Sequence, residues 1–400
     1  MTNFFEVSKQ SLSSRARLGS VNTVHGEVKT PSFIFCGTKA TVKSILPQQL
    51  RSAKTQIILS NTYHLMLQPG PDIISKEKGL QNFTQWRGPM MTDSGGYQIF
   101  SLGHGSVSEE IKGKNKNIKR KSLIKISEEG AIFRNYLNGD KVYLTPERSI
   151  ELQRHFGADL IFVLDECTPF NVSKKYTENS MYLSHRWAKR CSDAFKTTYS
   201  KFDSQSGSSG RQYLYGIIQG GVYDDLRKIA CEETCSGDYN GLAIGGSLGG
   251  SKEQMHDIFS FCSDLIDKSK PVHVLGIGGL DDILHGVSCG YDTFDCVSPT
   301  RIARHGIMLS RLSAKGINLN NSKFKNDHSF IDEECELPEI NNFSKSYLHH
   351  LFKANEILGI VILSLYNIWF MNKFFEEIRI NIQNDTFEIF KKNFLDNLSK

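Results

Sequence analysis

The chain has 400 residues, of which 39% are hydrophobic and 23% are charged, with 33 glycines and 10 prolines. This composition is typical of a globular protein and excludes collagen-like, mucin-like and largely disordered chains. Lys and Arg outnumber Asp and Glu by 48 to 43, and the resulting net charge of +5 permits a polyanionic partner without requiring one.

The N-terminal residues and the cysteines indicate a reducing compartment. Residues 1–20 contain neither the apolar core nor the small-residue cleavage site of a secretory signal. The 9 cysteines are scattered, whereas secreted disulfide frameworks are short, cysteine-dense and even in number. The longest apolar run, residues 357–370, is shorter than the about 20 residues that cross a bilayer. We therefore expect a cytoplasmic protein without a membrane span.

Short apolar runs rich in β-branched residues predict buried strands. They are almost continuously apolar, as in parallel strands that are covered on both faces. These runs lie at residues 56–60, 160–166, 213–220, 241–246 and 272–279. Stretches with helical character separate or flank them, at residues 146–157, 178–201, 223–235 and 252–268. The alternation predicts an α/β fold with a parallel sheet, which is either a (β/α)8 TIM-type barrel or an open doubly wound sheet.

Polar or glycine-rich residues follow the predicted strands at their C-terminal ends, namely Asp165, Gln219, Gly245, Gly246 and the stretch 276–279. Barrel enzymes build their active sites from these ends, although an open sheet also binds ligands there. Because one barrel with insertions can use the whole length, we favour a single catalytic barrel domain over residues 1–400.

Three segments read as additions to that pattern. Residues 104–125 contain the run KGKNKNIKRK, with six basic residues and no acidic one. This run is either a solvated surface loop or an arm that contacts phosphates. Residues 202–210 have the composition of a flexible linker. Residues 316–350 are polar and poor in apolar residues, and predict a small subdomain before a C-terminal helical segment.

Two acidic motifs are candidate sites on local grounds. Asp93 stands in the string MMTDSGGYQ, whose glycines let the backbone approach a planar ligand closely, although such a string is more often a turn. Asp165 and Glu166 follow an apolar run directly. Since adjacent side chains point to opposite sides, only one of these two should face a pocket, and a helix N-cap is the alternative interpretation.

A third acid, Asp295, ends an apolar run in TFDCVSPTR, with Arg301 and Arg304 close behind it. This arrangement suits a carboxylate beside a bound phosphate backbone. The adjacent Cys296 is better interpreted as a core thiol than as a nucleophile, because no His–Asn partner accompanies it. Two carboxylates facing one pocket are what retaining glycosyl chemistry requires. Sequence spacing alone does not show that Asp93 and Asp295 converge.

Several longer strings together resemble one family. GTKATVKSILPQQL, SNTYHLMLQPG, MTDSGGYQIFSL, DECTP, GIIQGG, GLAIGGS and FDCVSPTR resemble, in order, the tRNA-guanine transglycosylase (queuine tRNA-ribosyltransferase) family. The resemblance covers the chain from about residue 10 to about residue 395. It implies a (β/α)8 barrel with an inserted zinc-binding subdomain. It also implies exchange of the wobble guanine in tRNAs with a GUN anticodon, those for aspartate, asparagine, histidine and tyrosine, for a 7-deazaguanine base (queuine or its aminomethyl precursor).

The resemblance also implies residue roles. Asp295 matches the nucleophile that attacks C1′ of the ribose, and Asp93 matches the proton acceptor for the incoming base. The positions that match base-binding residues are Ser94, Gly95, Gly96, Tyr97, Asp165, Gln219 and Gly246, with Tyr97 stacking on the base. The positions that match tRNA-contacting segments are Gly276, Ile277, Gly278, Gly279, Leu280, Asp281, Asp282, Thr300, Arg301, Ile302, Ala303 and Arg304. The implied partners are tRNA and the base, a homodimer is compatible with this, and no membrane is implied.

The first departure from the family pattern concerns zinc. Family members carry a C-x-C-x2-C motif and, about 26 residues later, a His as zinc ligands. In this chain the motif retains only Cys335, with Leu337 and Ile340 at the other two positions and Tyr366 at the His position. We therefore expect a degenerate subdomain over residues 316–370 that binds no structural zinc, and we expect no other cofactor.

The second departure concerns the base pocket. The segment GGSLGGSKEQM, residues 245–255, is one residue shorter than the usual bacterial Gly-Gly-Leu-Ala-Val-Gly-Glu segment and lacks its Glu. Gly249 or Gly250 replaces the Val, which predicts room for queuine at least as much as for the smaller precursor.

We expect an active tRNA-modifying transferase. One alternative is a non-catalytic RNA-binding partner subunit, but such a subunit would be expected to lack the acid pair, and here Asp93 and Asp295 both stand in intact motifs. Another is an ordinary barrel glycoside hydrolase, which would need neither the TRIAR segment at 300–304 nor the basic run.

Overall fold

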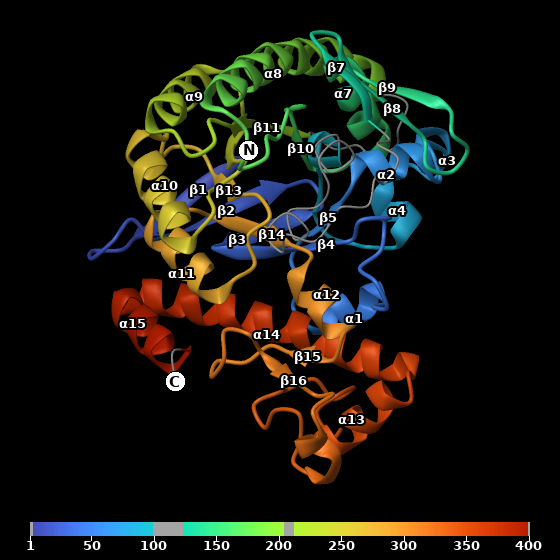
Figure 1. The fold of residues 1–400 in the computed structure, drawn as a ribbon, viewed down its shortest axis with the longest axis vertical. Coiled ribbons are helices and arrows are strands. Elements are labelled where there is room, and N and C mark those ends of the chain that lie inside the picture. Colours follow the sequence, from blue (N-terminus) through green and yellow to red (C-terminus); the bar gives the residue numbers. More distant parts are fainter. Residues whose placement is uncertain (1–2, 99–122, 204–211, 399–400) are drawn as a thin grey trace.

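The computed structural model describes residues 3–98, 123–203 and 212–398. Within these ranges, eight parallel strands close a barrel in which the last strand pairs with the first (Figure 1). The strands are β4 (Ser32–Cys36), β5 (Ile58–Ser60), β6 (Met90–Thr92), β10 (Leu160–Phe162), β11 (Tyr213–Ile218), β12 (Gly241–Ile244), β13 (Val272–Val274) and β14 (Thr293–Cys296). The predicted (β/α)8 barrel is confirmed, and closure of the sheet excludes the open doubly wound alternative.

The barrel strands are short and buried on both faces. Every residue of β5, β6, β10, β11, β12 and β13 is buried. This explains the nearly continuous apolar runs in the sequence. The strands end earlier than those runs predicted: β10 stops at Phe162, but Val163 and Leu164 remain fully buried in the loop that follows. The apolar pattern therefore marks burial, and it continues into the loops that cover the barrel.

Helices follow the strands and surround the barrel. The first half of the barrel carries α1 (Pro47–Ser52), α2 (Thr62–Leu67), α3 (Pro71–Lys76), α4 (Leu80–Thr84) and α7 (Pro146–Phe156). The second half carries α8 (Lys174–Asp203), α9 (Asp224–Ser236), α10 (Lys252–Leu265), α11 (Leu280–Ser288) and α12 (Ser298–Ala303). All four predicted helices are present. In α7, Thr145 caps the first turn by accepting from the amide of Arg148, and the helix ends at Gly157 with φ 70°.

Two three-stranded antiparallel sheets in the described residues accompany the barrel and were not predicted. The first comprises β1 (Phe5–Gln10), β2 (Arg17–Thr23) and β3 (Gly26–Thr30), and the second comprises β7 (Leu123–Ser127), β8 (Gly130–Arg134) and β9 (Lys141–Leu144). The last residues of the expected insertion 104–125 therefore belong to a paired strand. The basic run itself lies outside the described residues. So does most of the expected linker 202–210, whose first two residues end α8.

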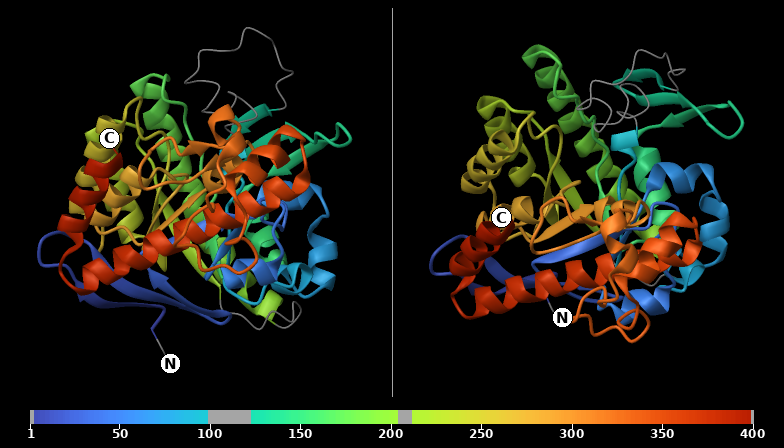
Figure 2. Two further views of the ribbon diagram at one scale, coloured as in Figure 1. Left: turned by 90° about the horizontal axis from the view of Figure 1, so that it is seen from below. Right: turned by 60° about the horizontal axis from the view of Figure 1, so that its bottom comes forward.

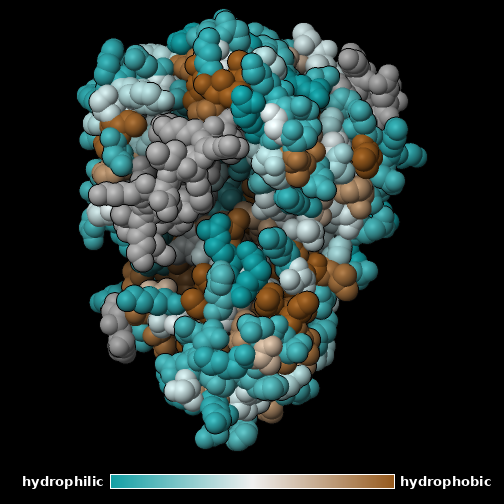
Figure 3. Space-filling view, turned by 45° about the vertical axis from the view of Figure 1, so that its right-hand side comes forward, coloured by the Kyte–Doolittle hydropathy of each residue, from teal (hydrophilic) through white to brown (hydrophobic). Residues whose placement is uncertain are grey.

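A small C-terminal lobe lies below the barrel in the view of Figure 1. It contains β15 (Ile307–Met308), β16 (Ile317–Asn318), the 3-10 helix η1 (Ser322–Asn326) and α13 (Lys345–Lys353). The surface of the lobe is mainly hydrophilic, and apolar residues gather where it meets the barrel (Figure 3). The chain then returns along the barrel in α14 (Ile357–Gln383) and ends in α15 (Phe387–Leu398).

The long helix α14 packs along the barrel beside β1 and β2 (Figure 2). The ring of Phe375 lies 6.0 Å from the rings of both Phe33 in β4 and Phe294 in β14. Among the described residues, α14 is the one helix whose length and composition would allow a membrane span, and 67% of its most apolar window is buried inside the structure. The apolar run at 357–370 is therefore the first half of a longer helix that packs on the barrel.

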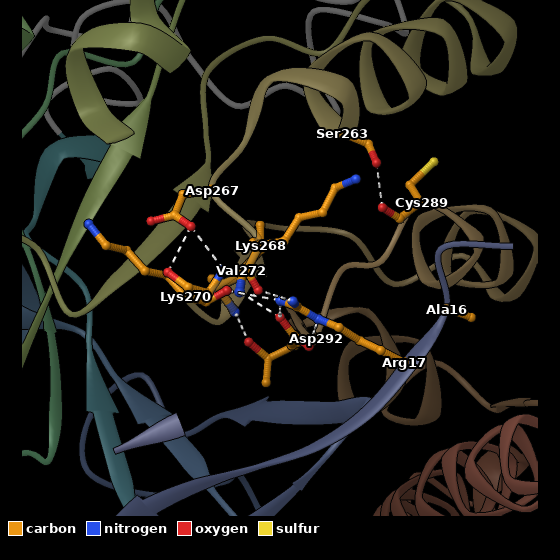
Figure 4. A network of polar contacts seen from close by, with 12 residues as sticks. Ala16, Arg17, Ser263, Asp267, Lys268, Lys270, Val272, Cys289 and Asp292 are labelled. Atoms are coloured by element: carbon orange, nitrogen blue, oxygen red, sulfur yellow. Dashed lines mark hydrogen bonds and ion pairs between the residues drawn. The ribbon is translucent and has the colours of Figure 1, made fainter. Parts of the chain in front are cut away.

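Buried polar contacts fasten the first antiparallel sheet across the N-terminal end of the barrel. Arg17, at the start of β2, forms a bidentate ion pair with Asp292, which immediately precedes β14 (Figure 4), with distances of 3.0 Å from Nε to Oδ1 and 2.6 Å from Nη2 to Oδ2. Asp159, which precedes β10, accepts from His25 Nδ1 at 2.7 Å and from the amide of Met90 at 2.9 Å. The first antiparallel sheet, held by these contacts, therefore covers the N-terminal end of the barrel.

Candidate active site

Each barrel strand places a functional group at its C-terminal end. Because all eight strands are parallel, these ends meet at one mouth of the barrel. Cys36, Asn61, Asp93 and Asp165 end or follow β4, β5, β6 and β10, and Gln219, Gly246, Gly276 and Asp295 end or follow β11, β12, β13 and β14. The sequence predicted six of these eight positions, but it did not single out Cys36 or Asn61.

Asp93 is held by neutral donors. Its Oδ1 accepts from the backbone amides of Thr62 at 2.9 Å and Gly95 at 3.2 Å, and its Oδ2 accepts from the side-chain amide of Asn61. Desolvation in the mouth nevertheless raises the pKa of Asp93 from 3.8 to about 7, and the negative charge of Asp295 adds to the rise. A carboxyl group with a pKa near neutrality can both accept and return a proton.

Asp295 is buried and its two oxygens have different environments. Oδ1 lies 3.1 Å from Nε2 of His273 and accepts from the amide of Gly276 at 3.0 Å. Oδ2 is contacted by the thiol of Cys36 at 3.4 Å. Burial raises the pKa of Cys36 well above its usual value, so it stays a thiol. Among the described residues, neither Asp93 nor Asp295 forms an ion pair with a Lys or Arg, so both remain available for chemistry.

Asp165 and Gln219 form a polar pair beside these acids. Gln219 Nε2 donates to Asp165 Oδ2 at 2.6 Å, and Ser94 Oγ donates to Oδ1 at 3.3 Å. A Cβ at Gly96 would lie 2.3 Å from Asp165 Oδ1, and a Cβ at Gly246 would lie 2.3 Å from Gln219 Oε1. Both positions therefore require glycine for close approach of the backbone to the pair. Burial raises the pKa of Asp165 to about 6.

Glu166 points elsewhere, as the sequence predicted for one of the two adjacent acids. Its Oε1 accepts from the hydroxyl of Tyr176 at 2.7 Å, on α8. Cys296 also behaves as predicted: its sulfur accepts from the amide of Ser298 at 3.3 Å, and burial raises its pKa to about 11. A thiol that resists ionisation is a poor nucleophile.

Arg227 organises the two loops that carry Gln219 and Gly246. Its guanidinium is fully buried and donates to the carbonyls of Ile218 at 3.0 Å, Gly221 at 2.7 Å and Ser247 at 3.2 Å. Sequence reasoning missed this residue. The available signal was a cation on the buried face of α9, in register with the apolar residues three and four positions later.

The predicted tRNA-contacting residues lie in two short segments, one that follows β13 and one in and just after α12. Gly276 bonds to Asp295, and the acids that begin α11 are held by the protein, with Asp282 accepting from His256 at 3.0 Å. In α12, Thr300 and Ala303 are buried, whereas Arg301 is exposed. Arg301 is thus the charged residue of α12 that is best placed to meet a phosphate.

A side chain at Gly249 or Gly250 would meet neighbouring side chains, and the predicted room for queuine remains a prediction. A Cβ on Gly250 would lie 2.8 Å from the ring of Phe170, and one on Gly249 would lie 2.7 Å from the side-chain oxygen of Gln254. The glycines therefore accommodate neighbouring side chains. Tyr97, the predicted stacking residue, is 46% exposed at the edge of the described residues.

The residues at the family's zinc positions do not fit a zinc ion. Cys335, Leu337, Ile340 and Tyr366 are all buried, but only Cys335 offers a sulfur ligand, and burial raises its pKa to about 11. The hydroxyl of Tyr366 donates to Oδ2 of Asp332 at 2.7 Å instead. In the part of the chain that the structure describes, no cluster of three or more His, Cys, Asp or Glu residues could hold a metal.

Comparison with known proteins agrees with this geometry. A family profile for queuine tRNA-ribosyltransferase matches residues 11–400. The chain is 40% identical over 385 residues to the queuine tRNA-ribosyltransferase of Roseiflexus sp. (strain RS-1), across 96% of each chain. It is 40% identical over 386 residues to that of Protochlamydia amoebophila (strain UWE25), across 96% of this chain and 97% of the relative. It is 39% identical over 394 residues to that of Natranaerobius thermophilus, across 98% of both.

Proposed function

We propose a reaction for this chain on the premise that it belongs to the queuine tRNA-ribosyltransferase family, whose members are tRNA-guanine transglycosylases. The chain exchanges the wobble guanine of tRNAs with a GUN anticodon for a 7-deazaguanine base, through a covalent bond between Asp295 and the ribose. One observation carries this proposal: two carboxylates lie at the barrel mouth with no Lys or Arg partner among the described residues, and burial, with a smaller contribution from the charge of Asp295, raises the pKa of Asp93 to about 7.

In the first step the carboxylate of Asp295 attacks C1′ of the ribose. The new oxygen–C1′ bond forms as the C1′–N9 bond to guanine breaks, and the electron pair leaves with guanine. Asp93, whose pKa is about 7, is protonated in part of the molecules at neutral pH and supplies the proton that guanine takes up. A carboxylate nucleophile thereby divides one difficult displacement into two easier ones.

In the second step a 7-deazaguanine base occupies the place of guanine. Asp93, now a carboxylate, accepts the proton from N9 of this base, N9 bonds to C1′, and Asp295 is released as a carboxylate. Two inversions at C1′ return the original configuration. The paired Asp165 and Gln219 offer acceptors and donors to the polar edge of the base, and Gly246 lets the backbone approach it.

Partner recognition rests on charge. Arg301 is exposed on α12, directly after the strand that carries Asp295, and is suited to hold a phosphate of the anticodon loop. We assign the basic run at 112–121 a supporting role in tRNA affinity. It should not select the anticodon, because phosphate contacts position RNA without reading its sequence. We propose a cytoplasmic location, with which a tRNA partner is compatible.

Exchange of labelled guanine tests the proposal. The protein should incorporate labelled guanine into a tRNA with a GUN anticodon, and a tRNA with an altered anticodon serves as the matched control. Without an incoming base, enzyme and tRNA should migrate as one band in denaturing electrophoresis, and Asp295→Asn should abolish that band. Folded protein that incorporates no guanine would favour the non-catalytic partner subunit.

A further inference from the structure

We propose that His273 is a positioning residue that directs Oδ2 of Asp295, and not Oδ1, at the ribose carbon. The inference deepens the proposed function, since it rests on Asp295 being the nucleophile. It concerns a residue that neither the sequence motifs nor the predicted site included.

His273 lies in β13 and is completely buried. In the register of the barrel it pairs with Thr293 of the neighbouring β14. Thr293 and Asp295 are two residues apart, so their side chains leave β14 on the same face. The imidazole bridges both: Nδ1 lies 2.9 Å from Thr293 Oγ1, and Nε2 lies 3.1 Å from Asp295 Oδ1.

These two contacts fix the tautomer of a neutral imidazole. An ionised carboxylate can only accept, so Nε2 carries the proton that points to Asp295. The bare Nδ1 then accepts from the hydroxyl of Thr293, and every polar atom in the chain Thr293–His273–Asp295 has a partner. In the opposite tautomer, the lone pair of Nε2 would face a carboxylate oxygen and repel it. Thr293 therefore orients the imidazole, and the imidazole orients the carboxylate.

The resulting asymmetry distinguishes the two oxygens of Asp295. Oδ1 accepts two N–H donors, from His273 and from the amide of Gly276 at 3.0 Å. Among the described residues, Oδ2 is contacted only by the thiol of Cys36 at 3.4 Å, and a thiol is a weak donor. The lone pairs of Oδ2 are thus the less engaged ones, and Oδ2 is the oxygen free to form a bond.

The same contacts serve both steps. When Oδ2 bonds to C1′ and guanine leaves, Oδ1 becomes the carbonyl oxygen of the ester and keeps its two donors. When the incoming N9 attacks C1′, the Oδ2–C1′ bond breaks and its electron pair returns to the carboxylate. His273 and Gly276 then stabilise the charge that reappears. The proton of His273 stays on Nε2 throughout, so His273 transfers nothing.

Replacing His273 by either of two amide residues distinguishes a positioning role from the mere filling of space in the core. The amide nitrogen of a glutamine can occupy the place of Nε2, whereas that of an asparagine reaches only the place of Nδ1. We expect His273→Asn to slow formation of the covalent tRNA adduct in a single turnover on the order of 100-fold, because the nucleophile loses its orientation. His273→Gln should recover most of that loss. The KM for tRNA should change in neither variant, since His273 lies inside the barrel wall.

A second pair of variants tests the other oxygen. A serine hydroxyl at position 36 is a stronger donor than the thiol and would engage the lone pair of Oδ2. We therefore expect Cys36→Ser to slow adduct formation more than Cys36→Ala does. This ordering is the reverse of that expected if a donor at Oδ2 helped the reaction. Thermal unfolding of each variant controls for loss of fold.

The outcomes separate this inference from the proposed function. Equal rates for His273→Asn and His273→Gln in folded protein, or a faster Cys36→Ser than Cys36→Ala, would overturn the assignment of Oδ2. Wild-type protein that forms no adduct, or Asp295→Asn protein that still forms one, would instead overturn the role of Asp295.

Discussion

The two ends of the barrel treat the same residue type in opposite ways. At the N-terminal end, Asp292 receives a bidentate guanidinium from Arg17 and the amide of Val272 at 2.7 Å (Figure 4). At the C-terminal end, the donors that Asp93 and Asp295 meet among the described residues are amides, an imidazole and a thiol. Each of these acids lies in a barrel strand or next to one, so proximity to a strand does not explain why their partners differ.

The difference lies in what neutralises each charge. A bidentate Arg pairs with the carboxylate of Asp292 and lowers its pKa against the burial that raises it, and this ion pair makes Asp292 a structural fastener. Amides, an imidazole and a thiol orient Asp93 and Asp295 without a Lys or Arg partner among the described residues, and burial raises the pKa of Asp93 to about 7. An uncompensated carboxylate costs stability and retains reactivity. The fold therefore places acids that form ion pairs at one end and the acids that we propose to be reactive at the other.

Replacing Asp295 by Asn, at the C-terminal end of the barrel, should abolish guanine exchange and leave the protein folded. Asp295→Asn keeps the volume and removes the anionic nucleophile, so guanine exchange should fall by at least about 1,000-fold. The unfolding temperature should stay equal or rise, because a buried charge is lost. Exchange assays and thermal unfolding of one preparation measure both quantities. A large drop in unfolding temperature would mean that Asp295 is structural as well.

At the N-terminal end of the barrel, Asp292→Asn should lower stability and leave the KM for guanine unchanged. It leaves the buried guanidinium of Arg17 without its anion, which costs about 3–5 kcal/mol when one partner of a buried pair is removed. Urea unfolding measures this loss. At a temperature where the variant is folded, its KM for guanine should match that of the wild type. A variant that is as stable as the wild type would show that the carbonyls of Lys268 and Lys270 alone suffice to hold Arg17.

The pKa of Asp93 predicts two opposite pH trends. Addition of the incoming base to the preformed tRNA adduct should rise with pH through about 7, because this step needs Asp93 ionised to take the proton of N9, whereas the preceding release of guanine uses the protonated form. Stability should move the other way. The folded-state pKa lies above the ordinary 3.8, so the contribution of the protonated form is complete below pH 3.8 and is lost as pH rises through about 7.

Comparison with Asp93→Asn isolates the stability trend. The amide does not titrate, so the difference in unfolding free energy between variant and wild type should grow in favour of the variant from about pH 4 to about pH 7. Unfolding in urea at each pH gives that difference. A difference that is constant with pH would show that Asp93 is already ionised at pH 4.

The smallest effect is expected in the C-terminal lobe, which we propose is stabilised without zinc. Elemental analysis should find well under one equivalent of zinc, and a chelator should leave the unfolding temperature unchanged. Tyr366→Phe should lower stability by about 1 kcal/mol, since it removes the hydrogen bond to Asp332. Tyr347→Phe, at a half-exposed ring on α13, is the matched control. One equivalent of zinc that disappears on Cys335→Ala would contradict the proposal.

The sequence predicted the barrel and the acids at the ends of its strands because both leave local patterns. The apolar runs that became β10, β11 and β12 mark strands covered on both faces, and Asp165 and Gln219 follow such runs directly. Resemblance to a family supplied the pairing of Asp93 with Asp295, which local patterns could not.

What the sequence did not predict depends on contacts between distant residues. Cys36 meets Asp295 across the closure of the barrel, and Arg227 meets Ser247 between two loops. The sequence around Cys36 and the sequence around Arg227 do not indicate these partners. His273 stood inside the predicted strand 272–279, where a buried histidine usually fills core space. The sequence did not predict the β1–β3 and β7–β9 sheets, because their strands are partly exposed and lack the apolar runs of the barrel strands.

The seam between β14 and β4 has a consequence for biosynthesis. Asp295 pairs with Ile34 across this seam, so the first and last barrel strands must meet before Cys36 can reach the nucleophile. A growing chain on the ribosome is surrounded by tRNAs. Until β14 has been made and has joined both β13 and β4, the contacts of Asp295 with His273, Gly276 and Cys36 are incomplete. Completion of the barrel is thus a condition for the reactivity that we propose for Asp295.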